Sequence, residues 1–204
     1  MMTLDLGENE ISIIEREAFV NLSRLEEICL VENKITRLNP DSFVKLPRLN
    51  YFDVSNNRII KIQKGFFKFF NNDCVRICLQ YNAIEVLDGE AFVGSTTKKV
   101  LIHLGHNYIE FVPSGFFQGR CFEGVDLTYN KISNFSEDFL LQKIDIEFLA
   151  LSFNPLEEET LEEMTSWAKE NDVELVCSDH SDGVRSEISV TLKIAALIFT
   201  KFIV

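Results

Sequence analysis

Two segments decide the fold of this chain: LEEICLVENKI, residues 25–35, and LNYFDVSNNRI, residues 49–59. Each places apolar residues five and three positions before an asparagine, and another apolar residue two positions after it. Alternating apolar residues are typical of a short strand with one buried face. The asparagine suits the turn that follows, because its amide both donates and accepts hydrogen bonds and can satisfy backbone groups that a strand ladder leaves unpaired. Each segment therefore predicts a strand followed by a turn.

This pattern recurs along most of the chain. Successive asparagines lie 24, 24, 25, 25, 23 and 24 residues apart, a regularity that chance does not produce. They are Asn9, Asn33, Asn57, Asn82, Asn107, Asn130 and Asn154. A phenylalanine follows ten residues after each of the first five, whereas Leu140 holds that place in the sixth unit, beside Phe139. A coil of this length cannot bury its apolar edge alone, so we expect the coils to stack into a solenoid.

The repeat resembles the 24-residue "typical" class of leucine-rich repeat, which is found in extracellular receptors and adhesion proteins. The resemblance covers about three quarters of the chain. It implies an α/β solenoid shaped like a horseshoe, with about seven repeats, a parallel sheet on the concave face and a short helical cap at the C-terminal end. It also implies that the chain recognises a protein partner through the concave face, outside the cell or at its surface. An intracellular leucine-rich repeat scaffold or regulatory subunit is the alternative, since this scaffold carries many unrelated tasks.

The sequence divides into three parts: a repeat array over 1–154, a cap and linker over 155–183, and an apolar tail over 184–204. In the cap, apolar residues at helical spacing predict a helix with one buried side. They are Leu161, Met164, Trp167 and Ala168. Thr160 and Glu163 are spaced as a capping box, which predicts that this helix starts at Thr160.

The two ends of the chain carry further expectations. Met1 and Met2 fall inside a repeat, so the resemblance implies a signal sequence and further repeats upstream, the alternative being a cytosolic start. Residues 188–204 form a mostly apolar stretch that Lys193 and Lys201 interrupt. As a helix they would span about 25 Å, less than the roughly 30 Å of a bilayer core. We expect either a membrane or removable lipid anchor signal, or a disordered tail.

Composition excludes several classes of function. The chain carries 20 Lys and Arg against 32 Asp and Glu in 204 residues, a net charge of −12, so a nucleic-acid partner is not expected. Five cysteines are an odd number for a disulfide framework.

No phosphate-binding loop, nucleophile motif or metal-ligand spacing is present in the sequence, so we predict neither an enzyme nor a bound cofactor or metal.

Candidate partner-binding residues lie at positions that strand alternation is expected to turn outward. The early repeats offer acidic residues there and the later repeats aromatic ones. The set is Glu32, Asp53, Tyr81, His106, Tyr129, Phe148 and Phe153. Five of them immediately precede an asparagine. The four of these that carry rings, in successive repeats, predict a column of rings one strand step, about 4.8 Å, apart. Rows of exposed rings are typical of binding hot spots.

Two Asn-x-Ser sequons, at Asn21 and Asn134, permit glycosylation if the chain is extracellular. Both are expected at the convex or edge surface.

Overall fold

The computed structural model describes residues 2–177. The predicted apolar tail and most of the predicted linker lie outside these residues, so the anchor prediction is untested.

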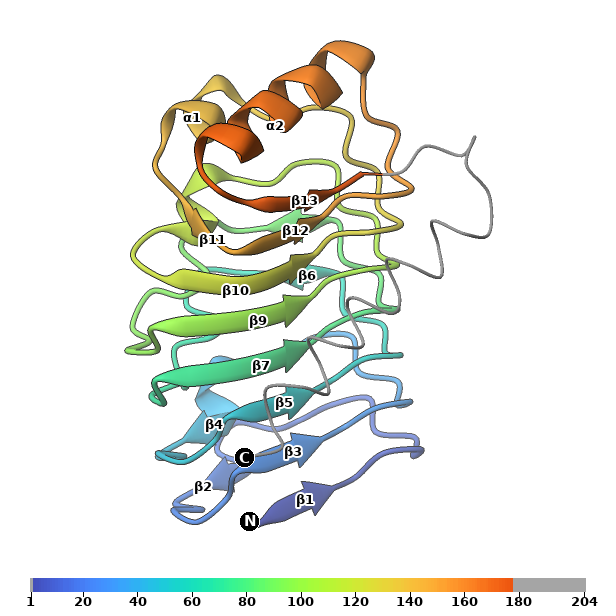
Figure 1. Cartoon of the computed structure of the whole chain (residues 1–204). Coiled ribbons are helices and arrows are strands. Elements are labelled where there is room, and N and C mark those ends of the chain that lie inside the picture. The colour runs from blue at the N-terminus through green and yellow to red at the C-terminus, as the bar shows by residue number, and fades with distance from the viewer. Residues whose placement is uncertain (1, 178–204) are drawn as a thin grey trace.

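One long parallel sheet forms a face of the molecule (Figure 1). Its strands follow the order β1-β3-β5-β7-β9-β10-β12-β13, and β11 pairs separately with β10. The strands are β1 (Thr3–Asp5), β3 (Glu27–Cys29), β5 (Tyr51–Asp53), β7 (Cys74–Cys78), β9 (Lys99–His103), β10 (Cys121–Asp126), β11 (Asp145–Ile146), β12 (Phe148–Ala150) and β13 (Glu174–Val176). The first seven strands in this order each precede one of the seven asparagines. The predicted leucine-rich repeat solenoid with a parallel sheet is therefore confirmed.

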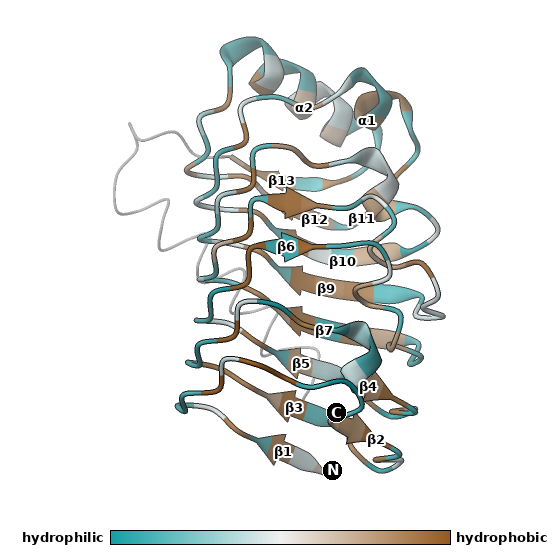
Figure 2. Ribbon diagram, turned by 180° about the vertical axis from the view of Figure 1, so that it is seen from behind, coloured by the Kyte–Doolittle hydropathy of each residue, from teal (hydrophilic) through white to brown (hydrophobic). Residues whose placement is uncertain are grey.

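The chain returns from each strand through short and varied segments on the opposite side, which Figure 2 shows from behind. Two strand pairs occur there: β2 (Phe19–Val20) with β4 (Phe43–Val44), and β6 (Lys61–Ile62) with β8 (Val86–Leu87). The other regular elements are the 3₁₀ turns η1 (Pro40–Ser42) and η2 (Ser114–Phe117) and the helix α1 (Glu137–Leu141). Such compact returns keep every coil near two dozen residues.

Asparagine side chains join each coil to the one before it. The Asn82 amide nitrogen donates to Leu79 O in its own coil and to Val54 O in the preceding coil, both at 3.0 Å, while its Oδ1 accepts from Ile59 N at 3.0 Å. The same three kinds of bond recur at Asn33, Asn57, Asn107, Asn130 and Asn154. Asn9, in the first coil, is exposed and its amide donates only within its own coil.

Phenylalanine rings form a continuous chain through the core. Ring centroids lie 5.4 Å apart in the first pair, Phe19–Phe43, and 5.3 Å apart in the last, Phe139–Trp167. Contacts of similar length link the rings between these ends: Phe69, Phe70, Phe67, Phe92, Phe116 and Phe117. Since each contact crosses from one coil to the next or fills a coil, the rings spread the core along the whole stack.

The sixth unit departs from the sequence pattern. Phe139, nine residues after Asn130, is fully buried, whereas Leu140, at the expected tenth position, is only partly buried. The cause is a local helix. Ser136 caps α1 by accepting a hydrogen bond from Phe139 N at 3.3 Å, and the Phe139 ring contacts Phe135, the residue before the cap, at a centroid distance of 4.7 Å. The ring beside the expected position, Phe139, is therefore the one that fills the core in this unit.

The C-terminal cap covers the end of the stack, as Figure 1 shows. Helix α2 (Glu158–Glu170) buries Met164, Trp167 and Ala168 against the core, and β13 extends the sheet beside β12. The predicted capping box was wrong: the helix begins at Glu158, so Thr160 lies inside the first turn and is buried. None of the helices within residues 2–177 is long and apolar enough to cross a membrane.

We predict that Asn82→Ala lowers the free energy of unfolding by about 1–3 kcal/mol, because it leaves Ile59 N, Leu79 O and Val54 O buried without their partner. Thermal and urea unfolding followed by circular dichroism measure this. Asn9→Ala is the matched control and should cost less than about 1 kcal/mol, since Asn9 makes no bond to another coil among the described residues. Equal losses in the two variants would contradict the assigned role.

A second prediction concerns the sixth unit. Phe139→Ala removes a fully buried ring and should cost about 3–5 kcal/mol in urea unfolding. Leu140→Ala, at the neighbouring position, should cost only about 1 kcal/mol because this side chain is already partly exposed. A larger loss in Leu140→Ala than in Phe139→Ala would contradict the assignment of Phe139 as the core residue of this unit.

Candidate functional site

The residue before each asparagine has the same unusual backbone conformation. Its φ lies between 52° and 61° in all seven units, in the left-handed region that non-glycine residues seldom adopt. These residues form what we call the turn column: Glu8, Glu32, Asn56, Tyr81, His106, Tyr129 and Phe153. Because the backbone geometry repeats, the side chains point in one common direction from successive coils. The column lies beyond the strand ends, since β7 stops at Cys78, three residues before Tyr81.

Four rings of the turn column stack face to face. Centroids are 4.2 Å apart for Tyr81–His106, 4.1 Å for His106–Tyr129 and 4.2 Å for Tyr129–Phe153, with planes within 13° of parallel. We call these four residues the ring stack. Tyr81, at one end, is 51% exposed, while the other three are partly buried. The structure thus brings together four of the seven predicted contact residues, at the rim of the sheet.

The turn column changes character below Tyr81. Asn56, Glu32 and Glu8 occupy the next three units, and all three are exposed. Glu32, predicted as a contact residue, therefore belongs to the same column as the rings, two units from Tyr81. The column offers aromatic surface at one end and negative charge at the other.

The sheet face, meaning the side of the sheet turned away from the core, carries polar groups in register. Asp53, Cys78, His103 and Asp126 lie side by side on β5, β7, β9 and β10. The Asp53 carboxylate is engaged locally: Oδ2 accepts from the Tyr51 hydroxyl at 3.0 Å, and Oδ1 accepts from the Ser55 amide and hydroxyl at 2.9 and 2.6 Å. Asp53, a predicted contact, thus lies on β5, one to four strands away from the members of the ring stack, and its carboxylate accepts hydrogen bonds at its own strand end.

Sequence reasoning did not find the alignment of Cys78, His103 and Asp126, because they come from three separate repeats. A thiol, an imidazole and a carboxylate in a row suggest a nucleophile site. The chemistry opposes this reading: burial, then the Asp53 charge, raises the pKa of the Cys78 thiol to about 12. An activated cysteine requires the opposite shift. The Cys78 thiol donates to the Tyr51 hydroxyl at 3.9 Å, and His103 Nδ1 lies 3.8 Å from Asp126 Oδ2.

Phe148 lies on the sheet face, where strand alternation predicts it, but it is buried there. It is only 4% exposed and packs with Ala150 and Val176 in a small apolar cluster on β12 and β13, separate from the main core. Phe148 therefore lies on the sheet face but outside the ring stack. We exclude it from the candidate binding surface.

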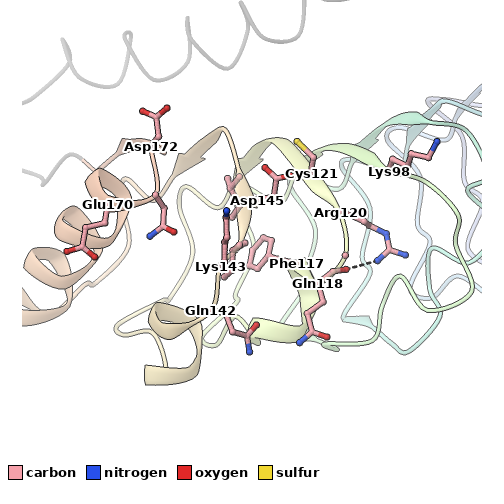
Figure 3. Close-up of a pocket in the computed structure, with 14 residues that line it drawn as sticks. Lys98, Phe117, Gln118, Arg120, Cys121, Gln142, Lys143, Asp145, Glu170 and Asp172 are labelled. Atoms are coloured by element: carbon pink, nitrogen blue, oxygen red, sulfur yellow. Dashed lines mark hydrogen bonds between the residues drawn. The ribbon is translucent and has the colours of Figure 1, made fainter.

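A groove of about 1180 Å³ opens near the cap, lined by residues that Figure 3 shows, among them Arg120 and Asp145. Arg120 is held by backbone: its guanidinium donates to Gln118 O at 3.0 Å and to Phe92 O at 2.9 Å, and lies over the Phe92 ring. The Arg120 side chain therefore joins backbone carbonyls of two neighbouring coils, and these contacts leave it unavailable to bind an anion. Since cations and carboxylates are mixed along the groove, it has no consistent charge for a ligand.

The sequons lie at the surface, with Asn21 and Asn134 both exposed. Within residues 2–177 no group of three or more His, Cys, Asp or Glu side chains is arranged to hold a metal ion.

Comparisons with known proteins agree with the architecture. A family model described as leucine rich repeat matches residues 1–59. A leucine-rich repeat protein of Leptospira interrogans has a similar solved structure, with a TM-score of 0.67 and 21% identity over 86% of this chain. This chain spans 42% of that protein's length. It is among 148 matching chains of solved structures, so the likeness describes a widely used fold. The curated proteins gave no match.

We predict that Cys78 resists alkylation in the native protein. With a pKa of about 12, only about one thiol in ten thousand is ionised at pH 8. Iodoacetamide at pH 8 followed by peptide mass spectrometry should leave Cys78 unmodified, whereas the same treatment in urea should modify it fully. A native rate equal to the rate in urea would show an accessible, ionisable thiol and reopen the nucleophile hypothesis.

Proposed function

We propose that this leucine-rich repeat protein binds a protein partner through the ring stack and the adjoining sheet face, by surface complementarity and without a catalytic step. Leucine-rich repeat domains generally act as protein-binding modules. The finer assignment, to this surface, rests on the residues described above.

The observation that carries the proposal is the ring stack itself. Aromatic side chains contribute most to binding when they are already ordered, because little rotamer freedom is then lost on association. Here each inner ring is held between two neighbours at 4.1–4.2 Å, and the backbone that carries it is fixed by the adjacent asparagine. Such a rigid surface is suited to a partner that matches the edge of the ring stack without rearrangement of the rings.

For location, we propose the cell surface or the extracellular space. Two observations support it: the resemblance to extracellular repeats and the exposure of Asn21 and Asn134. The alternative is an intracellular scaffold or regulatory subunit, and it has its own support. Cys29, Cys78 and Cys121 carry thiols that no disulfide joins, which is usual in reducing compartments. Peptide mass spectrometry of the protein from its native source decides: glycans on the sequons favour the first location, and unmodified sequons with alkylatable thiols favour the second.

The proposed binding surface is tested with Tyr129→Asn and Phe153→Asn. Asparagine tolerates the left-handed backbone, as Asn56 does in the third unit, so the substitution removes the ring without adding strain. Each variant should weaken the partner complex by about 1–2 kcal/mol, or roughly 5–30-fold in Kd, in titration calorimetry with a partner obtained by affinity capture.

Phe111→Ala is the control for this test, because Phe111 is 51% exposed and lies outside the turn column. Its Kd should match that of the wild type, and all variants should keep the parent circular dichroism spectrum. Unchanged affinity in both ring variants would reject the proposed surface.

A further inference from the structure

We propose that the open end of the ring stack, at Tyr81, binds an arginine side chain of the partner, with Glu32 as its counter-ion. The partner would therefore contribute a basic segment that runs along the acidic part of the turn column. This inference rests on the proposed function and adds the chemistry of the partner.

Tyr81 is the exposed end of the ring stack, with one face that the stack does not use, whereas Phe153, at the other end, is partly buried. His106 covers one side at 4.2 Å, and the next member of the column on the other side is the short amide of Asn56. Among the described residues no ring or cation stacks on that side, and Tyr81 is 51% exposed, in contrast to the partly buried rings of the stack. A flat group placed there would continue the stack.

The spacing of the column selects the kind of group. Successive units are about 4.8 Å apart, so a planar group above Asn56 lies one unit from the Tyr81 ring and one unit from Glu32. A guanidinium is planar, permanently charged and well suited to both stacking and a carboxylate. A lysine ammonium supplies the charge but no plane, and an apolar ring supplies the plane but no charge.

The charge around this position favours a cation. Glu8 and Glu32 are exposed in the column, and Asp5 and Glu27 lie on the neighbouring strands β1 and β3. Lys34, two residues after Glu32 in the sequence, is already engaged, because its Nζ pairs with Glu10 at 2.8 Å. That pairing, with a smaller contribution from Arg58, holds the pKa of the Glu10 carboxyl below its usual range. The net charge of −12 would also steer a basic partner toward the protein.

The experiment uses a defined probe in place of an unknown partner: acetyl-Gly-Arg-Gly-Arg-Gly-Arg-Gly-amide and its lysine analogue, titrated into the whole chain and followed by NMR of the tyrosine rings. The arginine peptide should shift the Tyr81 ring signals and bind about three- to tenfold more tightly than the lysine peptide. Tyr81→Asn should reduce its affinity by about three- to tenfold, and Tyr81→Phe, which keeps the ring face, by less than about twofold.

Matched controls separate this site from general attraction between opposite charges. Glu32→Gln should weaken the arginine peptide by about two- to fivefold and reduce its salt dependence, whereas Glu110→Gln, also exposed, should not. Tyr108→Ala should leave affinity unchanged, because Tyr108 is 47% exposed but outside the column, with Lys131 over its ring. Equal binding of the two peptides, or equal losses in Tyr81→Asn and Tyr108→Ala, would overturn the inference.

The same variants distinguish this inference from the proposed function. A captured partner that loses affinity with Tyr129→Asn but not with Tyr81→Asn or Glu32→Gln would refute the arginine site and leave the binding surface standing. A partner insensitive to Tyr129→Asn and Phe153→Asn would refute the surface itself.

Discussion

The structure depends on one repeated interaction, in which a buried asparagine amide hydrogen-bonds across to the preceding coil. A parallel strand leaves the first backbone groups after it without ladder partners, and the groups that bond to Asn82 are buried. The amide of Asn82 satisfies three such groups at once, one N–H and two C=O. Since these bonds tie each turn to its neighbour, they set the distance and register at which the apolar strands and the phenylalanine rings can pack.

That constraint also generates the candidate site. To bring the asparagine amide inward, the residue before it adopts φ near 55°, at a cost that L-residues normally avoid. Repetition of this turn places seven side chains in line, so whichever residues occupy the position become a column on the surface. Tyr81, His106, Tyr129 and Phe153 convert four of these places into a rigid aromatic edge. The repeated turn determines where these side chains lie, and their residue types determine what they can bind.

The sequence predicted the parts of the molecule that follow from periodicity. The asparagine spacing identified the coils, and the apolar pairs before each asparagine identified the strands, because both are enforced in every unit. Periodicity failed where one unit solves its packing locally: Ser136 caps a short helix that turns Phe139 inward in place of Leu140. It placed Phe148 on the outward face but did not show that Phe148 is buried there, by Ala150 of its own strand and Val176 of β13.

The candidate site was only partly predictable for a related reason. Simple alternation placed Tyr81 and Asp53 on the same face, yet the left-handed turn moves Tyr81 to the rim while Asp53 stays on β5 and binds Tyr51 and Ser55. A hydrophobic pattern does not reveal which residues adopt the left-handed backbone conformation, yet this conformation determines which side chains stack. Within a stack only the two end rings have a face that no other ring of the stack covers, and of these Tyr81 is the more exposed. A partner can therefore contact either the face of Tyr81 or the edges of all four rings. The column changes from an aromatic ring at Tyr81 to an amide at Asn56 and a carboxylate at Glu32. This change therefore makes the Tyr81 end of the column selective in the chemistry of the group that it binds.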